Sequence, residues 1–291
     1  MLKQNVIDAK NSLERYDFPR DVVIETSAFC NLNCVMCPQG KMERERGYMK
    51  LDVFKKIVDE VSWESPDTRI WIAIMGEALL NPHIVDMVRY ATDFGLHVYF
   101  NTNAMLLNKD MADRLIDENV HQFLIGLDAT TEEVYKKIRR GGDFDTVVEN
   151  AKYLIGKTDV LMQFIEMEEN QHQTEEFIDY WTGLGARVKA RPRLGWGPGV
   201  SADNLIVPES ERFPCPWLLR TVSIHWNGKM AQCDGDYEGG YSPGDVNEQT
   251  IKAVWEGELA KRRERHWNHD FTFPSCQKCK DWQAGRSYYY G

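Results

Sequence analysis

A short apolar segment followed by a longer amphipathic one recurs six times along this chain, and this alternation restricts the fold more than any other feature. Runs rich in β-branched and aromatic residues predict strands at 22–26, 69–74, 96–101, 122–127, 160–165 and 187–190. Apolar residues at helical spacing predict helices at 51–62, 82–94, 109–119, 131–138, 144–155 and 174–184. Strands that alternate with helices favour an α/β fold with a parallel sheet, whose reactive groups lie at the C-terminal ends of the strands.

The alternation stops near Gly195, and the remaining chain has a different pattern. Short alternating segments at 221–226 and 229–233 flank Asn227-Gly228, which is the strongest short signal for a β-hairpin. A helix is predicted at 250–263, and the aromatic tail at 287–290 either folds back over a pocket or forms a disordered end. We therefore predict a lead-in helix over 1–20, a core over 21–205 and a small hairpin-and-helix unit over 206–291.

Seven cysteines occur as a set of three and a set of four. Cys30, Cys34 and Cys37 lie within eight residues, directly after the first predicted strand. Thiolates select iron–sulfur clusters, zinc or Cu(I). Three of them can hold three corners of an iron–sulfur cube while the fourth iron stays open to a substrate. A zinc knuckle or an accidental cluster of cysteines is the alternative interpretation.

The second set has the spacing CX17C and CX2C and consists of Cys215, Cys233, Cys276 and Cys279. Two thiols from a hairpin and two from a tight turn can close a tetrahedral site for zinc or for a [4Fe–4S] cube. The residues alone do not decide between these two. A grouping of three and four does not resemble a disulfide framework.

Polar residues follow the predicted strands, where a parallel sheet gathers them at one edge. Gly76 and Glu77 end the second strand; the glycine allows a close approach of the backbone to a ligand, and the carboxylate can meet a cation. The fifth and sixth strands carry candidates for binding substrate hydroxyls or anions, namely Gln163, Glu166, Asn170, Lys189, Arg191 and Arg193. Solvated charges at strand ends would give the same pattern.

Taken in order, these motifs resemble those of the radical S-adenosylmethionine (radical SAM) enzymes. The CX3CX2C loop before Pro38 is similar to the cluster loop of that family, with Met36 where an aromatic residue is usual. Met75-Gly76-Glu77 resembles the GGE motif that holds the ammonium group of SAM. This resemblance assigns that contact to Glu77.

Further segments resemble the family at later strand ends. The segment 135–144 is similar to one whose arginine pairs with the SAM carboxylate, a role that falls to Arg139 ahead of Arg140. Gly126 stands where a serine usually meets the SAM ribose. The resemblance implies a partial (β/α)6 TIM-like barrel as the core. It also implies a SAM site that includes Gly76, Glu77, Asn103, Asp128, Arg139 and Gln163.

The C-terminal cysteines resemble the shortened SPASM, or twitch, domain of these enzymes, which carries one auxiliary [4Fe–4S] cluster. Within this group, their spacing is most similar to that of aminocyclitol dehydrogenases of butirosin biosynthesis. The resemblance covers about residues 20–285. It implies two [4Fe–4S] clusters and SAM as cofactors, and an external one-electron reductant such as flavodoxin or ferredoxin as a partner.

Such cofactors imply a 5′-deoxyadenosyl radical that takes hydrogen from an unactivated C–H bond. Because all seven cysteines are assigned to clusters, none remains as a hydrogen donor, and we expect oxidation of a secondary alcohol to a ketone. Arg191 and Arg193 would stabilise the developing alkoxide-like charge. Residues 1–20 are too short for a leader-binding domain, which favours a small polar substrate such as an aminocyclitol or sugar. The alternatives are an epimerase or decarboxylase acting on a sugar or peptide and, from another class, a non-enzymatic zinc or iron–sulfur module.

Composition argues against several other functions. A net charge of −10 and a pI near 5.3 oppose binding of nucleic acid through its phosphates. No apolar run is long enough to span a membrane, and the N-terminus lacks the apolar stretch of a signal peptide. We expect a cytoplasmic protein, since a reducing compartment keeps cysteines free.

Overall fold

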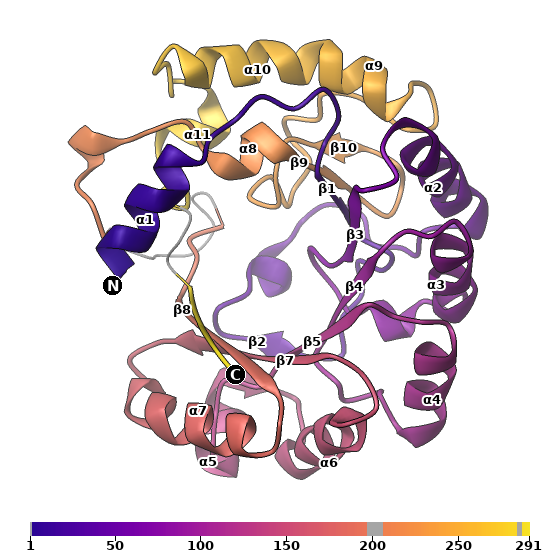
Figure 1. Cartoon of the computed structure of the whole chain (residues 1–291), viewed down its shortest axis with the longest axis vertical. Helices are drawn as coiled ribbons and strands as arrows, with labels where there is room; N and C mark the ends of the chain where they lie inside the picture. Colours follow the sequence, from indigo (N-terminus) through magenta and orange to yellow (C-terminus); the bar gives the residue numbers. More distant parts are fainter. Residues whose placement is uncertain (1, 197–205, 284–286) are drawn as a thin grey trace.

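The computed structural model describes residues 2–196, 206–283 and 287–291. Six parallel strands follow one another across its sheet in the order β1 (Asp21–Ile24), β3 (Arg69–Ile72), β4 (Val98–Thr102), β5 (Gln122–Gly126), β7 (Val160–Glu166) and β8 (Arg187–Pro192). They curve around a common centre, and the connecting helices lie outside them (Figure 1). The predicted α/β fold, a partial barrel of six βα units, is confirmed.

The helices on the outside are α2 (Leu51–Glu64), α3 (Ile84–Asp93), α4 (Lys109–Asp117), α5 (Glu132–Ile138), α6 (Phe144–Leu154) and α7 (Thr174–Gly183). Alternate strand residues point to opposite faces of the sheet. On β4, Val98 and Phe100 are fully buried in the core cluster against the helices, whereas Tyr99 and Asn101 face inward and are only half-buried. The main core therefore lies between strands and helices, and the inner face of the barrel stays partly accessible to solvent.

The C-terminal part of the chain extends the same sheet at both of its edges. β9 (Thr221–Ile224) pairs in parallel with β1, β10 (Met230–Ala231) pairs antiparallel with β9, and β11 (Tyr288–Tyr290) pairs antiparallel with β8. The remaining elements are α1 (Leu2–Asn11), β2 (Asn33–Cys34), β6 (Arg139–Arg140), α8 (Pro216–Arg220), α9 (Ile251–Glu256), α10 (Glu258–Trp267) and α11 (Pro274–Gln277). Along 288–290 the tail is thus not a disordered end, because β11 forms a strand at the edge of the sheet. That it folds back over a pocket stays a prediction.

Three predicted elements differ from the structure. The lead-in helix ends at Asn11 rather than near Pro19, since Asn11 and Ser12 favour a turn, and the Ser12 hydroxyl donates to the Ala9 carbonyl at 3.1 Å. The single helix at 250–263 is two helices, which break at Gly257, where a Cβ atom would lie 2.7 Å from the Ala253 carbonyl oxygen. The second hairpin strand, predicted over 229–233, is limited to Met230–Ala231.

The predicted boundary between core and C-terminal unit at 205/206 falls at the end of residues 197–205, which lie outside the described residues. The domain division at 20/21 and 205/206 stays a prediction. Within the described part of the chain, no helix combines the length and the apolar character needed to cross a membrane.

Candidate functional site

The loop that carries the first three cysteines is fixed by a small sheet of its own. Cys34 on β2 pairs with Arg139 on β6, and the Val35 N–H donates to the Ile138 carbonyl at 2.9 Å. Cys37 caps the following 3₁₀ turn, where its sulfur accepts from the Gln39 N–H at 3.5 Å. The loop therefore takes its shape from β6, which lies about a hundred residues further along the chain.

The three thiols of this loop are free and lie near one another. Burial, with a smaller contribution from the neighbouring thiols, raises the pKa of Cys30 to about 11 and that of Cys37 to about 12. Bare thiolates would repel each other here, whereas iron ions would neutralise them. The donor set and its electrostatics fit an iron–sulfur cluster.

The four C-terminal cysteines also come together. The pKa of Cys233 is raised well above its usual value by burial and then by the charges of Cys215, Cys276 and Cys279. Their surroundings supply hydrogen bonds to sulfur: the Gln232 amide donates to Cys276 Sγ at 3.1 Å, and the Asp281 N–H donates to Cys279 Sγ at 3.3 Å. Such donors stabilise thiolate ligands.

No group of three or more His, Cys, Asp or Glu among the described residues converges tightly enough to hold a single metal ion. A [4Fe–4S] cube binds each thiolate through a different iron, so its ligands need not converge on one point. The arrangement of both sets is compatible with such cubes.

Gly76 and Glu77 follow the end of β3 and contact the loop that precedes the first three cysteines. Gly76 has a φ of +81°, and a Cβ atom there would lie 2.0 Å from the Ser27 carbonyl oxygen, so only glycine fits. The Glu77 N–H donates to the Phe29 carbonyl at 2.7 Å. The sequence motif is therefore explained by close backbone contact within the protein.

The Glu77 carboxylate is fully buried. It accepts hydrogen bonds from Thr102 Oγ1 at 2.8 Å, from the Asn103 N–H at 2.8 Å and from the Leu79 N–H at 3.2 Å. Burial raises its pKa, and these donors partly offset that rise. A bound cation would lower the pKa again, so the site is suited to an ammonium group.

Asn103 connects Glu77 to the cluster loop. Its side-chain amide donates to Asn31 Oδ1 at 2.8 Å and lies 3.9 Å from Cys30 Sγ. Asn103 therefore lies beside Cys30, a predicted cluster ligand. Its direct contact with SAM stays a prediction.

Asp128 and Arg139 form a buried ion pair. The Arg139 Nε donates to Asp128 Oδ2 at 2.8 Å, and Nη2 lies 2.6 Å from the same oxygen. Burial alone would lower the pKa of Arg139, but the charge of and hydrogen bond to Asp128, together with the charges of Cys34 and Tyr135, outweigh it and the pKa is raised. A Cβ atom at Gly126 would lie 2.2 Å from Arg139 Nη2, so the guanidinium occupies the space that a serine would need.

The other predicted residues lie on β7, β8 and the segments that follow. Gln163 faces inward and donates to Asn101 Oδ1 at 3.2 Å. Arg191 and Arg193 are half-buried at the carboxyl end of β8. Asn170 is fully buried and hydrogen bonds to Met167 N–H and to two backbone carbonyls, so it supports the loop and is not available to a substrate. The assigned roles of Gln163, Arg191 and Arg193 stay predictions.

Sequence reasoning missed a second buried charge cluster, at the end of β1. Glu25 is fully buried, forms an ion pair with Arg44, accepts from the Trp226 N–H at 3.1 Å and lies 3.6 Å from His225 Nδ1. Burial would raise the pKa of Glu25, but His225 and Arg44 lower it. The same signal that singled out Glu77, a carboxylate at a strand end, could have singled out Glu25.

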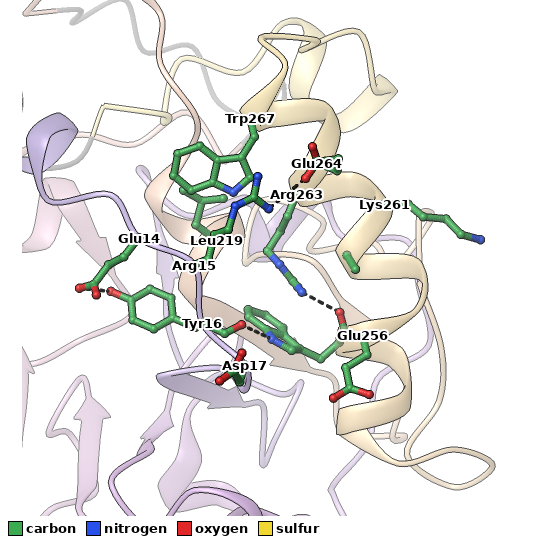
Figure 2. A pocket seen from close by; sticks show the side chains of 12 residues that line it. Glu14, Arg15, Tyr16, Asp17, Leu219, Glu256, Lys261, Arg263, Glu264 and Trp267 are labelled. Atoms are coloured by element: carbon green, nitrogen blue, oxygen red, sulfur yellow. Dashed lines mark hydrogen bonds and ion pairs between the residues drawn. The ribbon is translucent and has the colours of Figure 1, made fainter.

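A pocket of about 550 Å³ lies between residues 14–17 and α8 to α10 (Figure 2). Two tryptophan rings of the pocket form cation–π contacts with arginines. The Cζ of Arg263 lies 3.6 Å from the centre of the Trp255 ring, and that of Arg15 lies 5.1 Å from the centre of the Trp267 ring. None of the predicted site residues lines it. It reflects the packing of the lead-in segment on the C-terminal helices.

A profile of the Radical SAM superfamily matches residues 24–180. The chain belongs to this superfamily. A profile of an iron–sulfur cluster-binding domain, SPASM, matches residues 215–280, which contain all four C-terminal cysteines. The radical SAM protein therefore uses SAM and two [4Fe–4S] clusters, and the zinc interpretation of the cysteines is rejected.

Among known sequences, mycofactocin maturase MftC of Mycobacterium tuberculosis is 30% identical over 212 residues, which cover 70% of this chain and 52% of that protein. The chain spans about half the length of the curated relatives it matches. Because only about half of MftC is covered, this similarity supports a shared radical SAM core and does not extend to the activity of the whole relative.

Two solved structures share the fold. Streptococcus suis SuiB bound to the precursor peptide SuiA has a TM-score of 0.73 at 14% identity, with 97% of this chain and 74% of that chain covered. BtrN in complex with AdoMet and 2-DOIA has a TM-score of 0.64 at 15% identity, with 93% and 99% covered. The match to BtrN, of the butirosin pathway, agrees with the spacing of the C-terminal cysteines.

Replacing Cys30, Cys34 and Cys37 together by Ala should abolish SAM cleavage and leave about four irons per chain on the second set, since each cube holds four irons. Iron analysis and electron paramagnetic resonance of the anaerobically reconstituted protein measure this. The matched variant replaces Cys276 and Cys279 and should retain the first cluster. Loss of both clusters from either folded variant would contradict two independent sites.

Glu77→Gln should weaken SAM binding about ten- to a hundredfold, because a hydrogen bond to a charged group contributes about 1.5–3 kcal/mol. Anaerobic calorimetry of the reconstituted protein measures the affinity. Thr102→Val removes one donor to Glu77 but keeps its charge, so this control should weaken binding less. Equal losses in both variants would mean that Glu77 acts only by holding the loop.

Proposed function

We propose that this radical SAM protein oxidises a secondary alcohol of a small polar substrate to a ketone. The placement of all seven cysteines supports this proposal. They form two sets of mutually close, free thiols, so no cysteine is left to return a hydrogen atom to a substrate radical. Epimerases that quench a radical in this way need such a spare thiol.

When bound, SAM and the two clusters supply the one-electron chemistry, with reductive SAM cleavage at the first and electron acceptance at the second. In the proposed reaction, the alcohol carbon loses one hydrogen atom, which becomes part of 5′-deoxyadenosine. The hydroxyl group on that carbon loses one proton, and the substrate gives up one further electron, which an auxiliary cluster held by Cys215, Cys233, Cys276 and Cys279 would accept. The sum is a two-electron oxidation with one SAM consumed.

The residues of this chain position these events. The donors on Glu77, the neighbouring Asn103 and the ion pair of Arg139 with Asp128 keep the strand ends around the first cysteine loop fixed. Fixed dipoles and charges cost no reorganisation during reaction. Arg191 and Arg193, at the carboxyl end of β8, would stabilise the negative charge that develops on the substrate oxygen as its proton leaves.

A second candidate is modification of a peptide, which the relatives favour. MftC is named a maturase, and SuiB was solved with a precursor peptide. The partly accessible inner face of the barrel and the edge strand β11 could accept an extended segment as well as a small molecule. In either case, we expect a separate one-electron reductant such as flavodoxin or ferredoxin.

The reaction type can be tested in D2O with the reduced holoenzyme, SAM and panels of polyols and peptides. We expect one 5′-deoxyadenosine per product, a product that has lost two hydrogens, and no deuterium at the reacting carbon. Mass spectrometry measures all three. An inverted carbon that carries deuterium would instead indicate an epimerase with a non-thiol donor, and carbon dioxide would indicate a decarboxylase.

A further inference from the structure

β8 presents three basic residues to the inner face of the barrel. Val188 and Ala190 are buried against the outer helices, so Arg187, Lys189 and Arg191 point the other way. Arg187 is paired with Asp159. Lys189, in contrast, has no acidic partner among the described residues, although it is half-buried.

No acidic group among the described residues around Lys189 compensates its charge. On the neighbouring strands it stands level with Gln163 of β7 and Tyr289 of β11, and its Nζ lies 5.6 Å from the centre of the Tyr289 ring. The nearby charged groups are Arg191 on the same strand and Arg220 from α8. A lysine beside two arginines raises the free energy of the free protein, which is typical of a site that a ligand completes.

The carboxylate of Asp21, which pairs with Arg220, is already occupied by other donors. Asp21 accepts from Arg69 Nε at 2.7 Å and from Trp71 Nε1 at 2.8 Å, and Arg220 Nε also lies 3.3 Å from it. One carboxylate therefore serves two arginines and a tryptophan. Asp21 is therefore not available as an anionic partner for Lys189, and no other such partner occurs among the described residues.

We propose that Lys189 binds an anionic group of the substrate, a carboxylate or a phosphate ester, at the inner face of β8. The proposal rests on the function proposed above and narrows its substrate class to an anionic polyol. Arg191 and Arg220 add to the positive potential around this group. A protonated aminocyclitol would meet like charge here, so the potential disfavours the amine-bearing substrate that the cysteine spacing suggested.

The ionisation of Lys189 supports this assignment. Burial, with smaller contributions from the charges of Arg191 and Arg220, lowers its pKa to about 7. At a pH about one unit higher, roughly 90% of such a lysine is neutral. A bound anion favours the charged form, so binding should be accompanied by uptake of a proton.

Calorimetry on the reconstituted holoenzyme with saturating SAM, at about pH 8, tests the proposal with four probes: sulfate, gluconate, glucose and glucosamine. At least one of the two anions should bind about tenfold or more tightly than glucose, and glucosamine should not bind more tightly than glucose. Measurements in two buffers of different ionisation enthalpy should show uptake of up to about one proton per anion. Tight binding of sulfate alone would indicate that the substrate carries a phosphate ester, and tight binding of gluconate alone would indicate that it carries a carboxylate.

Lys189→Gln should weaken anion binding about ten- to a hundredfold and abolish the proton uptake. Lys189→Arg should retain the binding, and the exposed control Lys136→Gln should change neither quantity. Iron content and SAM binding show that each variant is folded. Failure of both anions to bind the wild type, tightest binding of glucosamine, or anion binding that Lys189→Gln leaves unchanged would overturn the proposal. Because these readouts need no turnover, they are independent of the proposed oxidation.

Discussion

The buried ion pair between Arg139 and Asp128 holds together parts of the chain that the site needs in one place. Asp128 directly follows β5, and its second oxygen accepts from the Ile165 N–H on β7 at 2.7 Å. Arg139 begins β6, which pairs with the first cysteine loop at Cys34. Removing one partner of a buried pair typically costs about 3–5 kcal/mol, because the other charge is left uncompensated. The position of the first cysteine loop therefore depends on the ion pair between Arg139 and Asp128.

A second constraint is that the two faces of the sheet have different roles: the outer face packs in the core, and the inner face carries polar residues. The outer face carries nearly all of the large core, and it fixes the strands in register. The inner face is free to carry polar and charged residues that a packed core would not tolerate. Stability and chemistry are thus assigned to alternate residues of the same strands, as β8 shows with Val188 beside Lys189.

The C-terminal hairpin is joined to the barrel rather than separate from it. β9 extends the sheet beyond β1, and the Glu25 cluster links the end of β1 to the hairpin through Trp226 and His225. One continuous sheet therefore connects β1, which precedes the first cysteine set, with β9 and β10, which lie between Cys215 and Cys233 of the second set.

The sequence by itself determined the six βα units, because periodicity and turn residues are local signals. It also determined both cysteine sets, because residue type and spacing identify metal-binding thiols. The sequence did not predict side-chain positions that depend on residues far away in the chain. Only the tertiary structure places Arg139 against Gly126, surrounds Glu77 with donors from β4 and its end, and leaves Lys189 without a carboxylate partner among the residues that it describes. These features arise from side chains far apart in the sequence, whose charges and volumes interact only after the sheet has curved around its centre.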